Sequence, residues 1–202
     1  NLRRVVCVIS PHENAYSQTF VRAHKQLLPA EIKSLYASDY ENVSDERGLL
    51  VKPDPAPRLR RALLRRSFNL DANYFQQQAL QRFLTRKKVD AVLVEFGPTA
   101  TLVMEACKKV NVPLIAHFHG FDPYRHRTLE TYGRRYSELF DIAAAIVAVS
   151  RDMQTQLEDL GAPREKIHCN SCGVELSFFK GADPVHNPPT FIAVGRFVSK
   201  KA

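Results

Sequence analysis

The sequence predicts an α/β fold in which a parallel sheet carries helices on both faces, a Rossmann-like arrangement. Short apolar runs, such as residues 5–9 and 90–96, alternate with segments whose apolar side chains recur at helical spacing. Strands separated by helices in this way are joined by right-handed crossovers into a parallel sheet. The 202 residues can bury the core of one full-sized α/β domain and are too few for two.

The amino-terminal part is expected to begin with a strand over residues 5–9, followed by a crossover helix. One face of that helix carries Phe20, Val21, His24, Leu27 and Leu28. Ser17 or Thr19 is placed to cap it. A short strand is expected over residues 32–36. Residues 37–57 have no clear period and contain three prolines, which predicts a long loop or only fragments of structure.

The alternation of helix and strand continues to about residue 170. Pro113 ends one helix, Ser150 caps another, and Gly161 closes it. The expected helices cover residues 75–84, 102–110, 128–141 and 151–160, and the expected strands cover residues 90–96, 114–118, 145–149 and 167–170. Ligands of such sheets bind at the carboxyl ends of the strands. The loops that matter therefore begin at Ser10, Glu95, His119, Ser150 and Ser171.

A change of composition after Asp183 indicates a domain boundary. The segment Pro-Val-His-Asn-Pro-Pro is typical of a linker, and one further strand is expected over residues 190–194. A single strand cannot bury itself, so the chain looks cut just inside a second domain. We expect an N-terminal Rossmann-like, acceptor-binding domain over residues 1–187, with the linker and first strand of a truncated donor-binding domain over residues 188–202.

Composition limits the cellular location and the classes of binding partner that we expect. Lys and Arg exceed Asp and Glu by 29 to 21, a net charge of +8, so nucleic acid, anionic lipid and phosphorylated small molecules are candidate partners. No apolar run reaches the roughly 18 residues of a spanning helix, and no secretion signal is expected. Four cysteines do not make a disulfide scaffold, because three sit in apolar segments where a thiol packs as a small hydrophobe. We expect a cytoplasmic protein.

A basic run over residues 58–66 is the candidate membrane contact. Arg58, Arg60, Arg61, Arg65 and Arg66 supply charge, and Leu59 and Leu63 supply an apolar stripe. The alternative is a solvated basic surface. Our hypothesis is that this run associates peripherally with an anionic membrane surface, at the inner face of the membrane. Nucleic acid is disfavoured because Trp is absent and no groove-reading module accompanies the charge.

Several short motifs in order resemble the amino-terminal half of glycosyltransferase family 4. They are Ala116-His117-Phe118-His119-Gly120-Phe121-Asp122, Tyr136-Ser137-Glu138-Leu139, Ala148-Val149-Ser150, Leu160-Gly161-Ala162-Pro163 to Lys166-Ile167, and Gly173-Val174-Glu175 with Phe178-Phe179. The closing segment 195–201 is similar to the start of that family's second domain. Ser17-Gln18-Thr19-Phe20 resembles members that build bacterial polysaccharides. The resemblance implies a two-domain, GT-B enzyme that transfers a sugar from a nucleotide donor with retention and without a metal.

The resemblance also implies roles for individual residues. His119 would be the catalytic residue, with Asp122, Arg125 and Glu95 on the acceptor side. From the sequence alone, Glu95 is either a cleft carboxylate or one tied to nearby loop amides. Arg196, Lys201 and Gly173 would serve the donor, since an arginine fork and a lysine suit a diphosphate that gains negative charge. Because the paired glutamates of the family's second domain are missing, we expect no turnover by the chain alone.

The sequence departs from the family pattern at three places. Pro11 to Tyr16 stands where many members have Gly-Gly, Ala202 where they have Gly, and Glu175 where they usually have Asp.

Metal and redox chemistry are the alternatives for the histidines and cysteines. His117 shares a strand face with His119, and with His126 they suggest zinc, but the ligand count is short. No Asp-x-Asp clamp for a divalent metal occurs, so we expect no metal and no cofactor besides the nucleotide-sugar co-substrate. A single Cys169-x-x-Cys172 pair is weak support for redox or zinc chemistry, and packing at a strand end is favoured.

Two other functional classes remain open at this point. The first is a non-catalytic Rossmann-like domain that binds a phosphorylated or nucleotide ligand at the same strand ends. A basic RNA-binding protein is a more distant alternative.

Overall fold

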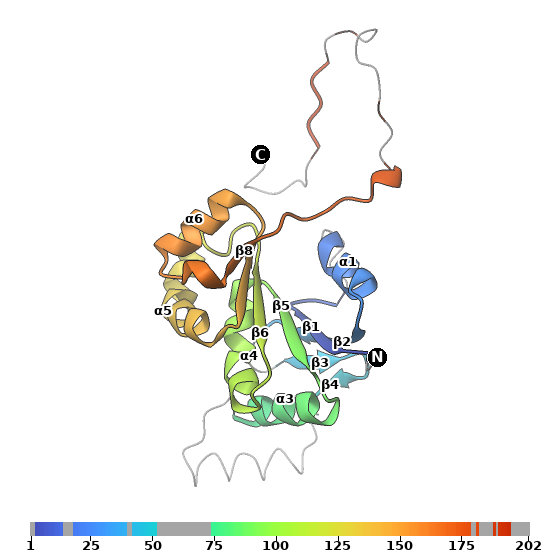
Figure 1. The fold of residues 1–202 in the computed structure, drawn as a ribbon, viewed down its shortest axis with the longest axis vertical. Helices are drawn as coiled ribbons and strands as arrows, with labels where there is room; N and C mark the ends of the chain where they lie inside the picture. Colours follow the sequence, from blue (N-terminus) through green and yellow to red (C-terminus); the bar gives the residue numbers. More distant parts are fainter. Residues whose placement is uncertain are drawn as a thin grey trace. The chain divides into compact units, whose positions relative to one another are not determined.

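The computed structural model describes residues 3–13, 18–39, 42–51, 74–178, 181, 188 and 190–194. Among them, eight strands form one sheet in the order β4-β3-β2-β1-β5-β6-β7-β8 (Figure 1). The strands are β1 Val5–Ser10, β2 Glu31–Ala37, β3 Val43–Asp45, β4 Gly48–Leu49, β5 Ala91–Glu95, β6 Leu114–Phe118, β7 Ala145–Ala148 and β8 Ile167–Cys169. The pairs β2–β1, β1–β5, β5–β6, β6–β7 and β7–β8 are parallel. The pairs β2–β3 and β3–β4 are antiparallel. The predicted α/β class is confirmed.

The helices follow the predicted alternation. They are α1 Thr19–Leu27, α3 Tyr74–Arg86, α4 Gly97–Lys109, α5 His126–Ile142 and α6 Arg151–Asp159, with short 3-10 turns at Arg164–Lys166 and Leu176–Phe178. Ser150 caps α6 as predicted, because its hydroxyl accepts a 3.1 Å hydrogen bond from the amide of Met153. Gly161 follows α6 with φ of +94°, a conformation that favours glycine.

Helices cover both faces of the sheet, as neighbouring residues of β6 show. His117 points toward α1, where its ring lies 5.3 Å from that of His24. The next side chain, Phe118, points to the opposite face, as successive residues of a strand do. There it packs against Tyr136 of α5, with ring centroids 5.3 Å apart. Figure 1 shows α1 on one side of the sheet and α4 and α5 on the other.

The order of the strands creates a switch point between β1 and β5. From β1 the chain passes through α1 to β2 on one side, whereas β5, β6, β7 and β8 follow one another on the other side. Crossovers that leave in opposite directions open a crevice at the carboxyl ends of the two central strands. Ser10 ends β1 and Glu95 ends β5, so the candidate site is expected there.

In the amino-terminal part, the predicted cap Thr19 is wrong and the predicted fragments of structure are confirmed. Thr19 is the first residue of α1 and not its cap, because Gln18 holds the N-cap position without a side-chain hydrogen bond. Ser17, the other proposed cap, lies outside the described residues. The expectation of fragments within residues 37–57 is confirmed in the described part, where β3 and β4 form a short antiparallel pair.

The structure divides into two compact units, Asn1–Cys172 and Gly173–Ala202. This division falls earlier than the expected domain boundary between residues 187 and 188, which stays a prediction. Within the second unit, residues 190–194 have no regular secondary structure. The expected first strand of a donor-binding domain stays a prediction.

Candidate active site

The carboxylate of Glu95 is the centre of a cluster of three histidines. Oε1 of Glu95 lies 2.6 Å from Nδ1 of His24 on α1. Oε2 lies 2.8 Å from Nε2 of His119 and 3.2 Å from Nδ1 of His117, at the end of β6. Glu95 is fully buried, and His117 and His119 are only 3% and 5% exposed. The cluster therefore joins α1, β5 and β6 at the predicted crevice.

Hydrogen bonds from the histidines keep the carboxyl group of Glu95 ionised. Desolvation by burial raises its pKa, but hydrogen bonds from His117, His119 and His24 outweigh burial and hold the pKa well below its ordinary value. Burial lowers the pKa of His119, and the hydrogen bond that His119 makes to Glu95 opposes that change only in part. At neutral pH the site thus holds a carboxylate beside a neutral His119 imidazole.

Aromatic rings pack against the imidazole of His119. The ring of Phe20 stacks on it with centroids 4.0 Å apart and an interplanar angle of 27°. Phe96 lies 4.9 Å away, and Phe121, which is 42% exposed, stacks on Phe96 at 6.3 Å. Phe96 has φ of +75°, which is strained for a bulky residue. This backbone conformation brings its ring to the edge of the site.

Asp122 holds together the two loops that carry Phe96 and His119. Its Oδ2 accepts hydrogen bonds from the amides of Gly97 at 2.9 Å and His119 at 3.0 Å. The side chain has no exposed surface, and Oδ1 has no partner among the described residues. Burial raises the pKa of Asp122 to about 7, against the lowering effect of the two amides. Asp122 is therefore a structural clamp of the site.

The structure describes five of the predicted site residues, and they differ in exposure. His119 lies at the carboxyl end of β6 as predicted, although it is buried and is not the exposed loop residue that its position in sequence suggests. Glu95 and Asp122 have no exposed atoms that an acceptor could contact. Arg125 is exposed at the N-cap of α5.

Gly173 is exposed and belongs to the second unit. The other predicted donor and membrane residues lie outside the described part of the chain: Arg196, Lys201, Arg58, Arg60, Arg61, Arg65 and Arg66.

The histidine cluster differs in membership from the one considered on sequence grounds. His126 is exposed and pairs with Glu130 of the same helix at 3.3 Å, whereas His24 takes its place beside Glu95. The ligand atoms of His24, Glu95 and His117 lie within 4.8 Å of one another, close enough for a metal ion. However, the separations of 2.6 and 2.8 Å to Glu95 are those of direct hydrogen bonds, which account for the cluster without an ion.

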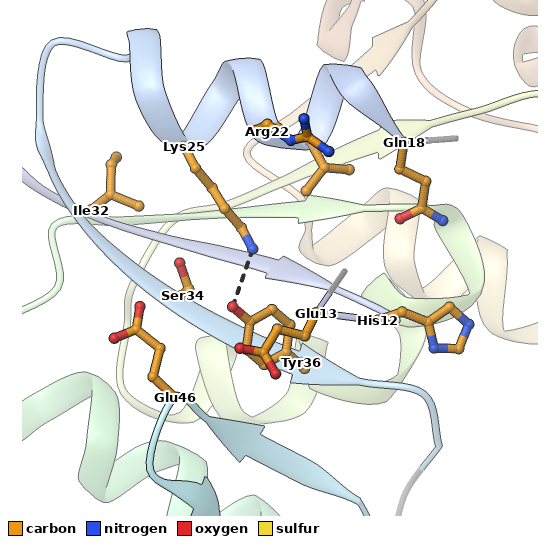
Figure 2. A pocket seen from close by; sticks show the side chains of 10 residues that line it. His12, Glu13, Gln18, Arg22, Lys25, Ile32, Ser34, Tyr36 and Glu46 are labelled. Atoms are coloured by element: carbon orange, nitrogen blue, oxygen red, sulfur yellow. Dashed lines mark hydrogen bonds between the residues drawn. The ribbon is translucent and has the colours of Figure 1, made fainter. Parts of the chain in front are cut away.

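A polar pocket of about 440 Å³ lies along a different face of α1 from that of Phe20 and His24. Arg22 and Lys25 of α1 line it, together with Tyr36 of β2 and with Glu13 and Glu46, which lie outside the strands. Figure 2 shows Lys25 reaching across the pocket to Tyr36, where Nζ lies 3.5 Å from the hydroxyl and 4.5 Å from the ring centroid. This pocket was not predictable from sequence patterns, because its residues come from four separate segments.

The four cysteines form a buried pair and an exposed pair. Cys7 and Cys107 are buried as expected, but the packing predicted for Cys169 and Cys172 is wrong, because both free thiols are exposed.

A membrane-spanning helix is not found in the described part of the chain. None of the helices there is both long enough and apolar enough to cross a bilayer.

Comparison with protein families gives a match to glycosyltransferase family 4 over residues 20–178. The amylovoran biosynthesis glycosyltransferase AmsK of Erwinia amylovora is 32% identical over 116 residues, which are 55% of this chain and 28% of that protein. The putative colanic acid biosynthesis glycosyltransferase WcaL of Escherichia coli K12 is 28% identical over 119 residues, 56% of this chain and 29% of that protein. The matched region is therefore under a third of either relative.

Solved structures show the same fold. HepE of Anabaena in complex with UDP superposes with a TM-score of 0.59 at 14% identity, over 89% of this chain and 46% of that one. The lipopolysaccharide outer core galactosyltransferase WaaB gives a TM-score of 0.52 at 10% identity, over 92% of this chain and 50% of that one. The family match covers more than half of the sequence and includes every residue of the histidine cluster. The chain belongs to glycosyltransferase family 4.

Proposed function

We propose that this chain is the N-terminal, acceptor-side domain of a retaining glycosyltransferase of polysaccharide or glycolipid synthesis. The enzyme would transfer a sugar from a nucleotide-sugar donor to a carbohydrate or lipid-linked acceptor without a metal. Family membership and the two relatives named for polysaccharide biosynthesis support this proposal. The observation that carries it is the buried Glu95–His119 pair at the crevice beside the switch point.

The donor would be bound largely by the second domain. Another crystal structure of HepE is a complex with UDP-glucose, which supports a nucleotide-sugar donor for this fold. A diphosphate gains negative charge as the bond to the sugar breaks, and cationic side chains stabilise that charge. Arg196 and Lys201, by resemblance, would supply it, with Gly173 allowing close backbone approach. Because the donor would be bound largely by the second domain, we expect no turnover by the 202-residue chain alone.

The acceptor would use surfaces that the structure exposes. The pocket beside α1 offers two cations, Arg22 and Lys25, and two carboxylates, Glu13 and Glu46, so its formal charges balance. A neutral, hydroxyl-rich sugar suits such a mixture of donors and acceptors better than an anion does. Arg125 is a second candidate contact because it is exposed. Glu95 and Asp122, being fully buried, would support the site from beneath rather than bind the acceptor.

Sugar transfer by the chain joined to its expected donor domain tests this proposal. That protein is incubated with radiolabelled UDP-glucose or GDP-mannose and a bacterial membrane extract that contains lipid-linked saccharides. We expect label in the lipid fraction and, by NMR of the product, the anomeric configuration of the donor. Specific binding of a nucleotide without transfer of any sugar would instead support the non-catalytic binding domain.

A further inference from the structure

Each oxygen of the Glu95 carboxylate faces imidazole nitrogens. Oε1 faces Nδ1 of His24, and Oε2 faces both Nε2 of His119 and Nδ1 of His117. An ionised carboxylate can only accept hydrogen bonds, so the nitrogen on the other side of each contact must carry a proton. The geometry therefore fixes three proton positions at once.

These proton positions define the tautomer of each ring. His24 and His117 therefore carry a proton on Nδ1, and the neutral imidazole of His119, which has one N–H, holds its proton on Nε2. Nε2 of His117 is buried and has no partner among the described residues. A second proton there would bury an unpaired N–H, which is more costly than a buried lone pair. The neutral Nδ1–H form of His117 follows.

The ring of His119 is held in place on several sides. Phe20 stacks on it at 4.0 Å, the ring of His117 lies 4.1 Å away, and the amide of His119 donates to Asp122. Rotation of the imidazole by 180° would break the 2.8 Å contact with Glu95. Since Nε2 of His119 is engaged by Glu95, the lone pair of Nδ1 is the one left for an outside donor.

We propose that Glu95 is the positioning residue of the site: it orients His119 and fixes its Nε2–H tautomer, so that Nδ1 accepts a hydrogen bond from a substrate hydroxyl. The assignment of the tautomers stands on the geometry alone. The role of the hydroxyl rests on the proposed function, since a sugar acceptor or donor supplies that group.

Nitrogen NMR of the histidine side chains in the 202-residue chain tests the assignment directly. Long-range ¹H–¹⁵N spectra are recorded at pH 7.5 on the protein as purified, with each ring assigned by single His→Asn variants and the exposed His126 as reference. The histidine side chain in water favours the Nε2–H form, so Nδ1–H forms at His24 and His117 would be a distinctive signature. Protons on Nε2 of these two rings, a proton on Nδ1 of His119, or metal-bound nitrogens without protons would each overturn the proposal.

Glu95→Gln provides a second test. The amide offers one acceptor oxygen and one donor NH₂, so it cannot accept from all three rings, and at least one tautomer must change. The matched control, Glu130→Gln, alters an exposed Glu–His pair and should leave His24, His117 and His119 unchanged. Three unchanged tautomers in Glu95→Gln would overturn the proposal. If Glu95→Gln does not fold, the wild-type spectrum still decides.

Measurement of kcat and KM for the chain joined to its expected donor domain distinguishes a positioning role of Glu95 from a purely structural one. Partners that orient metal-binding histidines matter by roughly 10- to 100-fold, and we expect an effect of that size on kcat in Glu95→Gln, with little change in KM for the donor. The double variant with His119→Ala should be no slower than His119→Ala alone, because Glu95 acts through His119. Additive losses would contradict this. If the enzyme transfers no sugar, the proposed function fails while the NMR result still judges the tautomers.

Discussion

His24 and Glu95 are 71 residues apart in sequence, yet Nδ1 of His24 lies 2.6 Å from Oε1 of Glu95. This contact fastens α1 to the end of β5. Other contacts of this helix add to it: Val21 is buried, Phe20 stacks on His119, and Lys25 contacts Tyr36 of β2. His24 supplies the link to Glu95 and so helps to position one wall of the polar pocket.

Replacing His24 by Ala tests this role of the contact. We expect the free energy of unfolding to fall by roughly 1.5–3 kcal/mol, the range for a hydrogen bond to a charged group, because Glu95 loses one of its donors. Urea denaturation measures the change. The control is His126→Ala, which removes an exposed i,i+4 pair with Glu130 and should change stability by less than about 0.5 kcal/mol. Equal losses in the two variants would show that the buried contact has no special weight.

Asp122→Asn should change the dependence of stability on pH. Burial raises the pKa of Asp122 from its ordinary value of 3.8 to about 7, so the folded state holds this proton more tightly than the unfolded chain. The protonated carboxyl of Asp122 therefore stabilises the folded state at low pH. This contribution to the free energy of unfolding is lost as pH rises from about 4 to 7. Asn keeps an acceptor for the amides of Gly97 and His119 and does not ionise.

The measurement for Asp122 is urea denaturation of both proteins at pH 5, 7 and 8.5. The NH₂ group of Asn lacks a buried acceptor at the position of Oδ1, a cost that does not vary with pH. Relative to the wild type, the Asn variant should thus gain stability with rising pH. A difference that stays constant over this range would mean that Asp122 titrates normally.

Gly97→Ala should damage the start of α4. A Cβ atom at this position would overlap the ring of Phe118, which is itself fully buried against Tyr136 and Phe140. Overpacking of this kind costs about 1–3 kcal/mol or more. Gly133→Ala in α5 is the control: its Cβ would meet no atom within 4 Å, so the better helix propensity of Ala should stabilise by about 0.5–1 kcal/mol. Thermal unfolding that shows the same sign for both variants would contradict the packing at Gly97.

Binding of residues 58–66 to anionic membranes is a prediction from sequence that lies outside the described residues. Each arginine near such a surface contributes about 1 kcal/mol, and the attraction should weaken with salt because the Debye length is about 8 Å at physiological ionic strength. We expect the chain to co-sediment with anionic vesicles at low salt. Changing Arg60, Arg61, Arg65 and Arg66 to Gln should abolish this. Equal sedimentation of both forms, or none of the wild type, would leave only a solvated basic surface.

Sequence patterns predicted the sheet and the place of His119 because strand ends and helical stripes are local signals. The partnership of His24 with Glu95 was not predictable in this way. Helical spacing put His24 on the apolar face of α1, but which strand residue it meets depends on the order β2-β1-β5, a tertiary property. The burial of His119 was missed for the same reason, since Phe20 and Glu95 cover it from other elements.

The central claim, that His119 serves sugar transfer, is tested most directly by turnover of the chain joined to its expected donor domain in His119→Gln and His126→Gln variants. Because His119 is buried and hydrogen-bonded, its replacement will also lower stability, so turnover is measured on protein shown by circular dichroism to be folded. We predict that His119→Gln lowers kcat by about 100-fold, because the substrate hydroxyl loses the acceptor that positions it and misplacement at a reacting centre costs about that much. His126→Gln should keep kcat within about twofold, as is usual for exposed positions. Near-native kcat in folded His119→Gln would contradict the claim.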